Sequence, residues 1–193
     1  MSMEPAVQAQ FETLDWYHAL TTPPPLVTDD TGLVQWTEEN RKWFERINEI
    51  GNLDHAKAML CGGIAQIAYI AIKEYSLNKS LCKNDAKDFS ISPRALAVKF
   101  CIGRRVHGIP LGLLVYAARI QYNHWEEGTP TNPVAKAVFR KLYDHYRENP
   151  MFDLAYMLDW PIHRPVTHHM LQSEMGWRSY DNYLKDIRET LDV

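Results

Sequence analysis

Between residues 58 and 72 the chain carries a run of 15 positions in which every side chain except Gln66 is apolar or aromatic. The run favours a helix over residues 54–75. A helix that is apolar on all sides is typical of the middle of a bundle. Gly62 and Gly63 would let neighbouring helices approach closely. Because the run is shorter than the ~20 residues that a membrane span needs, we predict a buried central helix and no membrane contact.

Helical signals also recur in the rest of the chain. Apolar side chains repeat every three or four positions, and Pro, Asn, Ser or Gly stands where such repeats begin or end. No segment shows the sustained alternation of polar and apolar side chains that is typical of an amphipathic strand. The sequence therefore predicts an all-α fold, a single globular bundle of about seven or eight helices with no sheet. Besides the central helix, we expect main helices near residues 5–20, 37–50, 92–102, 110–127, 132–149 and 180–191, with short helical segments at 151–158 and 167–175.

A length of 193 residues is suited to one domain, and we assign residues 1–193 to a single helical domain. Within it we expect a proline-rich connector at 21–30 and a polar loop at 76–92. The three cysteines include no CxxC pair, and the start of the chain lacks the basic and apolar regions of a secretory signal. These features predict a cytoplasmic protein in a reducing compartment, without a cofactor.

The net charge of −3 is unevenly distributed. Residues 94–149 carry nine Lys and Arg against four Asp and Glu, a balance of +5, and the segments on either side are acidic. This order suggests self-association, or a partner protein held through complementary acidic and basic faces. It also leaves open a nucleic acid bound by the 94–149 block. The candidate binding residues surround one glycine turn in this block, and they are Lys99, Arg104, Arg105 and Arg119.

Motifs of the commonest helical metalloenzymes are missing from the sequence. It has no HExxH and no pair of Glu-x-x-His segments, and it also lacks both glycine-rich phosphate loops, GxGxxG and GxxxxGK[ST]. Asp159, His163, His168 and His169 fall within eleven residues and could together ligate a divalent metal. Their spacing fits no helical ligand pair, so we interpret these histidines as surface or capping residues and predict no metal.

Two stretches have the pattern Arg-x-x-x-x-His, one from Arg119 to His124 and the other from Arg140 to His145. This spacing resembles the motif of helical HEPN-type ribonucleases. The resemblance implies that the Arg and His act on an RNA backbone, usually across a dimer. Histidine can move a proton, and arginine can stabilise a pentavalent phosphate, so the residue types suit that chemistry.

Three hypotheses on function follow. The first is a structural, assembly or protein-interaction subunit of a larger complex, such as a helical coat or nucleoprotein-type protein, without catalytic activity. The second is an RNA-binding or HEPN-like ribonuclease domain that uses an Arg-x-x-x-x-His pair. The third is a small-molecule-binding helical protein or enzyme with a pocket beside Gln66, whose buried amide needs a hydrogen-bonding partner.

Overall fold

A computed structural model describes residues 4–21, 41, 53–124, 132–147 and 166–193 of the chain. Seven α-helices dominate these residues, which confirms the predicted all-α fold. The predicted helices at 37–50 and 151–158, and all of the connector beyond Thr21, lie outside the described residues. The helices are α1 (Glu4–Thr21), α3 (Leu53–Tyr75), α4 (Lys83–Asp88), α5 (Leu111–His124), α6 (Pro133–Tyr146), α7 (Thr167–His169) and α8 (Tyr180–Leu191).

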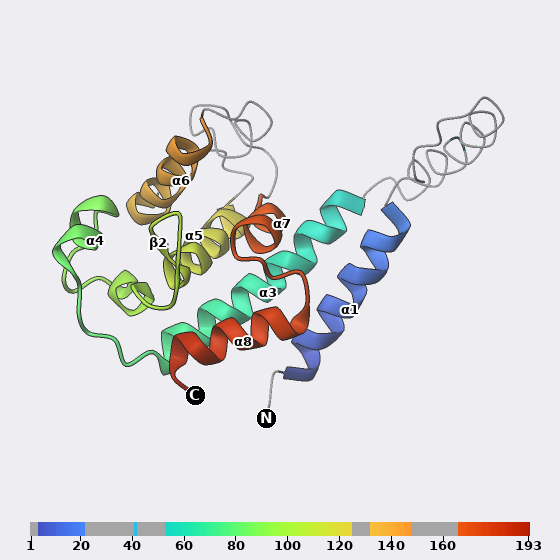
Figure 1. Cartoon of the computed structure of the whole chain (residues 1–193), viewed down its shortest axis with the longest axis horizontal. Coiled ribbons are helices and arrows are strands. Elements are labelled where there is room, and N and C mark those ends of the chain that lie inside the picture. The colour runs from blue at the N-terminus through green and yellow to red at the C-terminus, as the bar shows by residue number, and fades with distance from the viewer. Residues whose placement is uncertain (1–3, 22–40, 42–52, 125–131, 148–165) are drawn as a thin grey trace.

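Helix α3 is the centre of this arrangement. It contacts α1, α5, α7, α8 and the 3-10 helix η1 (Leu96–Phe100), and it runs through the middle of the molecule in Figure 1. Gly62 packs against the ring of Tyr122 on α5 so closely that a Cβ atom would not fit there, and Gly63 faces Gln10 on α1. The close approach expected at the small residues of this helix is therefore present.

The burial of α3 on all sides is not confirmed. Met59 is 56% exposed and Ile70 is 36% exposed. Eleven residues are close to three helical turns, so these two side chains lie on the same side of the helix. By length and composition the stretch Ala56–Tyr75, with a mean hydropathy of 1.2, could cross a membrane, but the core helix of a soluble protein meets the same criteria. Helix α3 is thus central in its contacts but has one side open to solvent.

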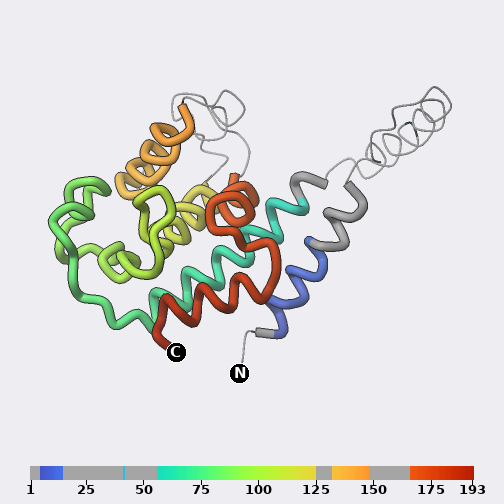
Figure 2. Tube along the Cα trace, in the orientation of Figure 1, coloured from blue at the N-terminus to red at the C-terminus, as the bar shows by residue number. Residues whose placement is uncertain are grey.

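The chain between α3 and α5 differs from the prediction. Helix α4 lies inside the expected polar loop, and the helix expected at 92–102 is reduced to the short η1. An antiparallel hairpin follows, formed by β1 (Arg105–Val106) and β2 (Ile109–Pro110), and Figure 2 traces the path from α3 through α4 and η1 to this hairpin. The prediction of no sheet missed this hairpin because strands of two residues are too short to show an alternating pattern.

The core forms where α3 and α5 meet the flanking elements. The first eight residues of α5, from Leu111 to Ala118, are all buried. Aromatic side chains from five other parts of the chain fill the space around the two helices. After α7 the chain forms one π-helical segment, η4 (Met170–Glu174), before α8 begins. The fully buried aromatic residues are Phe11, Phe89, Phe100, Phe139 and Trp177.

Candidate functional site

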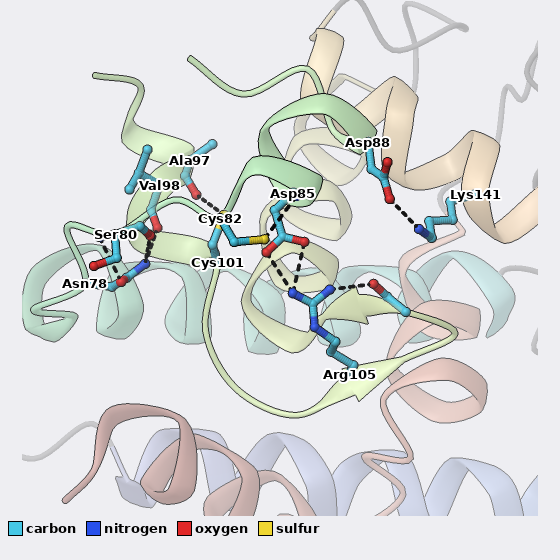
Figure 3. Close-up of polar contacts among 11 residues, drawn as sticks. Asn78, Ser80, Cys82, Asp85, Asp88, Ala97, Val98, Cys101, Arg105 and Lys141 are labelled. Carbon is cyan, nitrogen blue, oxygen red and sulfur yellow. Dashed lines mark hydrogen bonds and ion pairs between the residues drawn. The ribbon is translucent and has the colours of Figure 1, made fainter. Parts of the chain in front are cut away.

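Arg104 and Arg105, two of the four predicted binding residues, form ion pairs within the fold. Arg104 donates from Nε and Nη2 to the carboxylate of Asp186 on α8, at 2.9 and 2.8 Å. Arg105 donates from Nη2 to both oxygens of Asp85 on α4, at 3.0 and 2.7 Å, and from Nη1 to the carbonyl of Gly108 (Figure 3). Burial alone would raise the pKa of Asp85, but hydrogen bonding, chiefly from Arg105, outweighs it and the pKa is lowered.

Lys99 and Arg119, the other two candidates, both contact α3. Lys99 donates from Nζ to the carbonyl of Lys73 at 2.7 Å. Arg119 donates from Nε to Oε1 of Gln66 at 3.1 Å, and its guanidinium lies 4.8 Å from the ring centroid of Tyr69. The amide of Gln66, which was expected to need a hydrogen-bonding partner, therefore has one in Arg119 on α5.

The four cations thus contact three different elements: α8, α4 and, twice, α3. The side chains of the two hairpin-side arginines remain 43% and 49% exposed, so a partner could still reach them. Their role in binding stays a prediction. In the structure, each of the four side chains already connects two parts of the fold.

The two Arg-x-x-x-x-His pairs diverge on their helices, because five residues correspond to a rotation of about 140° beyond one full turn. Arg119 lies in the contact between α5 and α3, whereas His124 is exposed in the last turn of α5. Arg140 is exposed on α6, and His145 stacks on His107 of the hairpin, with ring centroids 3.6 Å apart. Neither pair therefore converges on one point within the described chain.

His145 instead belongs to a polar cluster that the sequence did not reveal. We call it the hairpin cluster, and its members are His107, His145, Tyr146 and Glu174. Tyr146 donates from its hydroxyl to Oε2 of Glu174 at 3.0 Å, and the same hydroxyl lies 3.1 Å from Nε2 of His107. Nε2 of His107 is also 3.3 Å from Oε2 of Glu174, whose side chain is only 1% exposed. Three segments far apart in sequence thus enclose one carboxylate.

The backbone around the hairpin cluster is unusual at two points. His107 and Gly108 form the two-residue loop of the hairpin and have φ values of +50° and +76°. A loop with both central residues in this region is a type I′ turn, which favours Asn-Gly and is strained by a histidine. Glu174 lies in the π-helical segment η4, and such segments are frequent at functional sites. The His-Gly pair between two apolar positions is the one sequence signal that could have marked this site.

The electrostatics of the hairpin cluster keep His107 neutral. Burial lowers the pKa of His107, and the neighbouring His145 lowers it further, against the opposing effect of Glu174. Burial and the charge of Glu174 raise the pKa of Tyr146 to about 12. When Nε2 of His107 carries the proton and faces Glu174, Nδ1 is left as the basic atom. None of the described residues hydrogen-bonds Nδ1, so this atom is suited to accept a proton.

No group of three metal-ligating side chains occurs among the described residues, and the stacked rings of the hairpin cluster do not converge on a common point. Of the four residues weighed as a metal site, Asp159 and His163 lie outside those residues. His168 and His169 are partly buried on α7, with their rings in an edge-to-face arrangement.

A second candidate site lies where the chain leaves α3. We call residues 75–78 the α3 exit segment. Leu77 is 89% exposed and Tyr75 is 71% exposed, and Leu96 in the neighbouring η1 is 42% exposed. Single apolar side chains on a surface are common. Two large ones only two positions apart, Tyr75 and Leu77, both mostly in solvent, are a feature of contact surfaces.

Hydrogen bonds fix the α3 exit segment on both sides of Leu77. Ser76 donates from Oγ to the carbonyl of Lys99 at 2.8 Å, and Asn78 donates from Nδ2 to the carbonyl of Val98 at 2.7 Å. Both bonds reach η1 or its last turn, so they hold the segment against a helix that packs on α3 and α5. Leu77 is therefore held in place by its neighbours while its own side chain is in solvent.

The chain matches no protein-family model, no curated protein and no solved structure. The two sites above are therefore interpreted from their own geometry.

Proposed function

We propose that this protein is a self-associating assembly subunit and that a second copy of the chain docks on the α3 exit segment. The observation that carries the proposal is Leu77, which is 89% exposed although hydrogen bonds on both sides fix its backbone. A leucine displayed in this way gains about 2 kcal/mol when a partner buries it. Because the segment is already ordered, little of that gain is lost in fixing its conformation.

The charges beside the segment favour a second copy over a different protein. Lys73 and Glu74 stand in the last turn of α3, side by side, with exposed fractions of 46% and 56%, and form an ion pair of 3.0 Å. In a two-fold contact, Lys73 of one copy can face Glu74 of the other, and the reverse pair forms at the same time. A surface that carries both signs is complementary to itself, whereas a partner of one charge would leave one of the two residues unmatched.

Light scattering coupled to size-exclusion chromatography tests the proposal on the full chain. We expect the wild type to shift to a larger species as its concentration rises. The Leu77→Asp variant should remain a monomer at the same concentrations. Met59→Asp is the matched control, because Met59 is also an exposed apolar residue, 56% exposed, but lies more than four turns before the end of α3.

Three outcomes would overturn the proposal. One is a wild type that stays monomeric at every concentration. Another is association that Met59→Asp abolishes and Leu77→Asp does not. The third is a monomer that binds phosphatidylcholine vesicles through Leu77, which would make a membrane surface the occupant of the α3 exit segment.

A second candidate function rests on a separate observation, the contact between His107 and the enclosed carboxylate of Glu174. A carboxylate that orients one ring nitrogen of a histidine leaves the other nitrogen as a general base. The hairpin cluster would then serve proton transfer in an enzyme. The ring centroids of His107 and His145 are 3.6 Å apart, too close to hold a substrate between them, so the two histidines would work from one side.

Activity assays with an RNA oligonucleotide and with ester substrates test this candidate. We expect any hydrolysis to be lost in His107→Asn and retained in His124→Asn, whose histidine lies at the exposed end of α5. Hydrolysis that persists in His107→Asn, or no hydrolysis of any substrate by the wild type, would count against it.

A further inference from the structure

The three cysteines occupy very different surroundings. Cys61 is completely buried in α3, and burial raises the pKa of its thiol to about 12. Cys101 is partly buried at the end of η1, and burial raises its pKa to about 11. Cys82 is exposed and forms the N-cap of α4. Cys82 is therefore the most open of the three cysteines to a reagent in solution.

Cys82 and Cys101 lie beside the same ion pair. The Sγ atom of Cys82 accepts a hydrogen bond from the backbone N–H of Asp85 at 3.3 Å, and Asp85 is the residue that Arg105 binds. A negative charge on Asp85 or Cys82 raises the pKa of Cys101, and the charge of Arg105 lowers it, so all four groups interact. Figure 3 draws the two cysteine side chains next to each other, one from the start of α4 and one from the end of η1.

A disulfide between Cys82 and Cys101 would replace only weak hydrogen bonds of the two sulfur atoms. The Sγ atom of Cys82 accepts from the backbone N–H of Asp85, which a disulfide sulfur can still do weakly, and its thiol also interacts with the Asp85 carboxylate as a weak donor. The thiol of Cys101 donates to the carbonyl of Ala97 at 3.5 Å, and a thiol is a weak donor. The positive charge of Arg105 favours the thiolate of Cys101 and so opposes the effect of burial on that residue.

We propose that Cys82 and Cys101 form a reversible disulfide through exchange with a low-molecular-weight disulfide such as oxidised glutathione. The thiolate of Cys82 attacks one sulfur of glutathione disulfide, whose S–S bond breaks and releases one glutathione thiolate. The thiolate of Cys101 then attacks Sγ of Cys82 in this mixed disulfide and releases the second glutathione. Two cysteine thiols are oxidised by two electrons, one glutathione disulfide is reduced to two thiols, and the two protons pass to the leaving thiolates.

The roles of the two cysteines follow from their surroundings. Cys82 is the attacking residue because it is exposed. Cys101 is the resolving residue because it is partly buried, with a raised thiol pKa, and reacts only when the mixed disulfide has formed beside it. The new bond would join the start of α4 to the end of η1, two elements that lie on the same side of α3 in Figure 1.

The test uses the full chain, treated with glutathione disulfide, alkylated and digested without reduction. Peptide mass spectrometry should find the Cys82 and Cys101 peptides joined, with Cys61 alkylated only after denaturation. A thiol reductant should reverse the link. In Cys101→Ser, the mixed disulfide with glutathione should accumulate on Cys82, whereas in Cys82→Ser, Cys101 should remain unmodified.

Three results would overturn the proposal. One is a wild type that carries only glutathione on Cys82. Another is a covalent dimer joined through Cys82 of two copies, which a non-reducing gel separates from the internal link. The third is oxidation of Cys61 at the same rate as Cys82, which would show that the local surroundings do not direct the reaction. None of these results depends on whether the α3 exit segment binds a second copy.

Discussion

The hairpin cluster and the α3 exit segment depart from the usual distribution of side chains in opposite directions. In the hairpin cluster, a carboxylate that would normally be in water is enclosed, with the side chain of Glu174 only 1% exposed. In the α3 exit segment, a leucine that would normally be enclosed is 89% exposed. The first departure is compensated inside the chain by Tyr146 and His107. The second has no such compensation among the described residues.

The difference separates contacts that stabilise the monomer from a surface that is available to a partner. A buried charge must find partners during folding, so the hairpin cluster contributes to stability whatever else it does. An exposed apolar side chain contributes almost nothing to the stability of the monomer, so its fixed position calls for an explanation outside the monomer. The predictions below are arranged by expected effect and test this contrast.

Removal of the enclosed carboxylate should have the largest effect. Glu174→Ala removes the buried carboxylate that the hydroxyl of Tyr146 and Nε2 of His107 share, and it should lower the free energy of unfolding by about 2–3 kcal/mol. Glu189→Ala is the control, because Glu189 is 60% exposed and only 3.9 Å from Lys185 in a surface pair. That change should stay within about 0.5 kcal/mol. Urea denaturation measures both, and equal effects would remove the distinction between the two kinds of carboxylate.

Acidification should destabilise the protein in part through His107. Its pKa is below the ordinary 6.5 because of burial and the nearby His145, with Tyr146 and Glu174 as the other groups that face it. Between the two pKa values the unfolded chain binds a proton that the folded chain does not. Stability is therefore full above about pH 6.5 and falls as the pH drops, by at most about 1.4 kcal/mol per pH unit for one proton. Thermal melts across this range should show a shallower slope in His107→Asn, and an unchanged slope would contradict the assignment.

The turn at His107 should tolerate asparagine. Asparagine adopts a positive φ more readily than histidine, and this relief offsets the lost contacts with Tyr146 and Glu174, so the change in stability should be within about 1 kcal/mol. Gly108→Ala is the control, because alanine at φ +76° should be destabilising by about 1–2 kcal/mol. Urea denaturation of the two variants should rank them in this order. If His107→Asn lowered the free energy of unfolding by several kcal/mol, the main role of His107 would be to stabilise the fold.

The smallest effect on stability should come from Leu77. Leu77→Asp should change the free energy of unfolding by less than about 0.5 kcal/mol when measured at low protein concentration, because the side chain is in solvent. The same variant is expected to abolish self-association. A large loss of stability would show that Leu77 supports the monomer, and the contrast with Glu174 would disappear.

Much of the fold could be predicted because capping side chains that are local in sequence mark where helices begin. Asn132 caps α6 through a hydrogen bond from the N–H of Ala135 at 3.0 Å, and Ser179 caps α8 in the same way from Asn182 at 3.3 Å. Both residues are recognisable as N-caps in the sequence, and the starts of the two helices were predicted from them. The hairpin and the shortened η1 were missed because neither is long enough to establish a periodic pattern.

The candidate sites were harder to predict, since each depends on contacts between distant segments. His145 was singled out, but its partners His107 and Glu174 lie 38 positions before it and 29 positions after it. Leu77 appeared as one apolar residue in a polar loop, and its exposure depends on bonds to η1. Likewise the basic block at 94–149 predicted charges for a partner, but did not show that Arg104 and Arg105 already face Asp186 and Asp85.

Hydrogen–deuterium exchange at low and high protein concentration tests the central claim most directly, because it locates the surface that association covers. We predict slower exchange at high concentration in peptides that span residues 75–81 and 96–100. Exchange in the hairpin at 105–110 should not change, and neither region should respond in Leu77→Asp. Protection that appears at the hairpin, or none at residues 75–81 while the protein associates, would contradict the account.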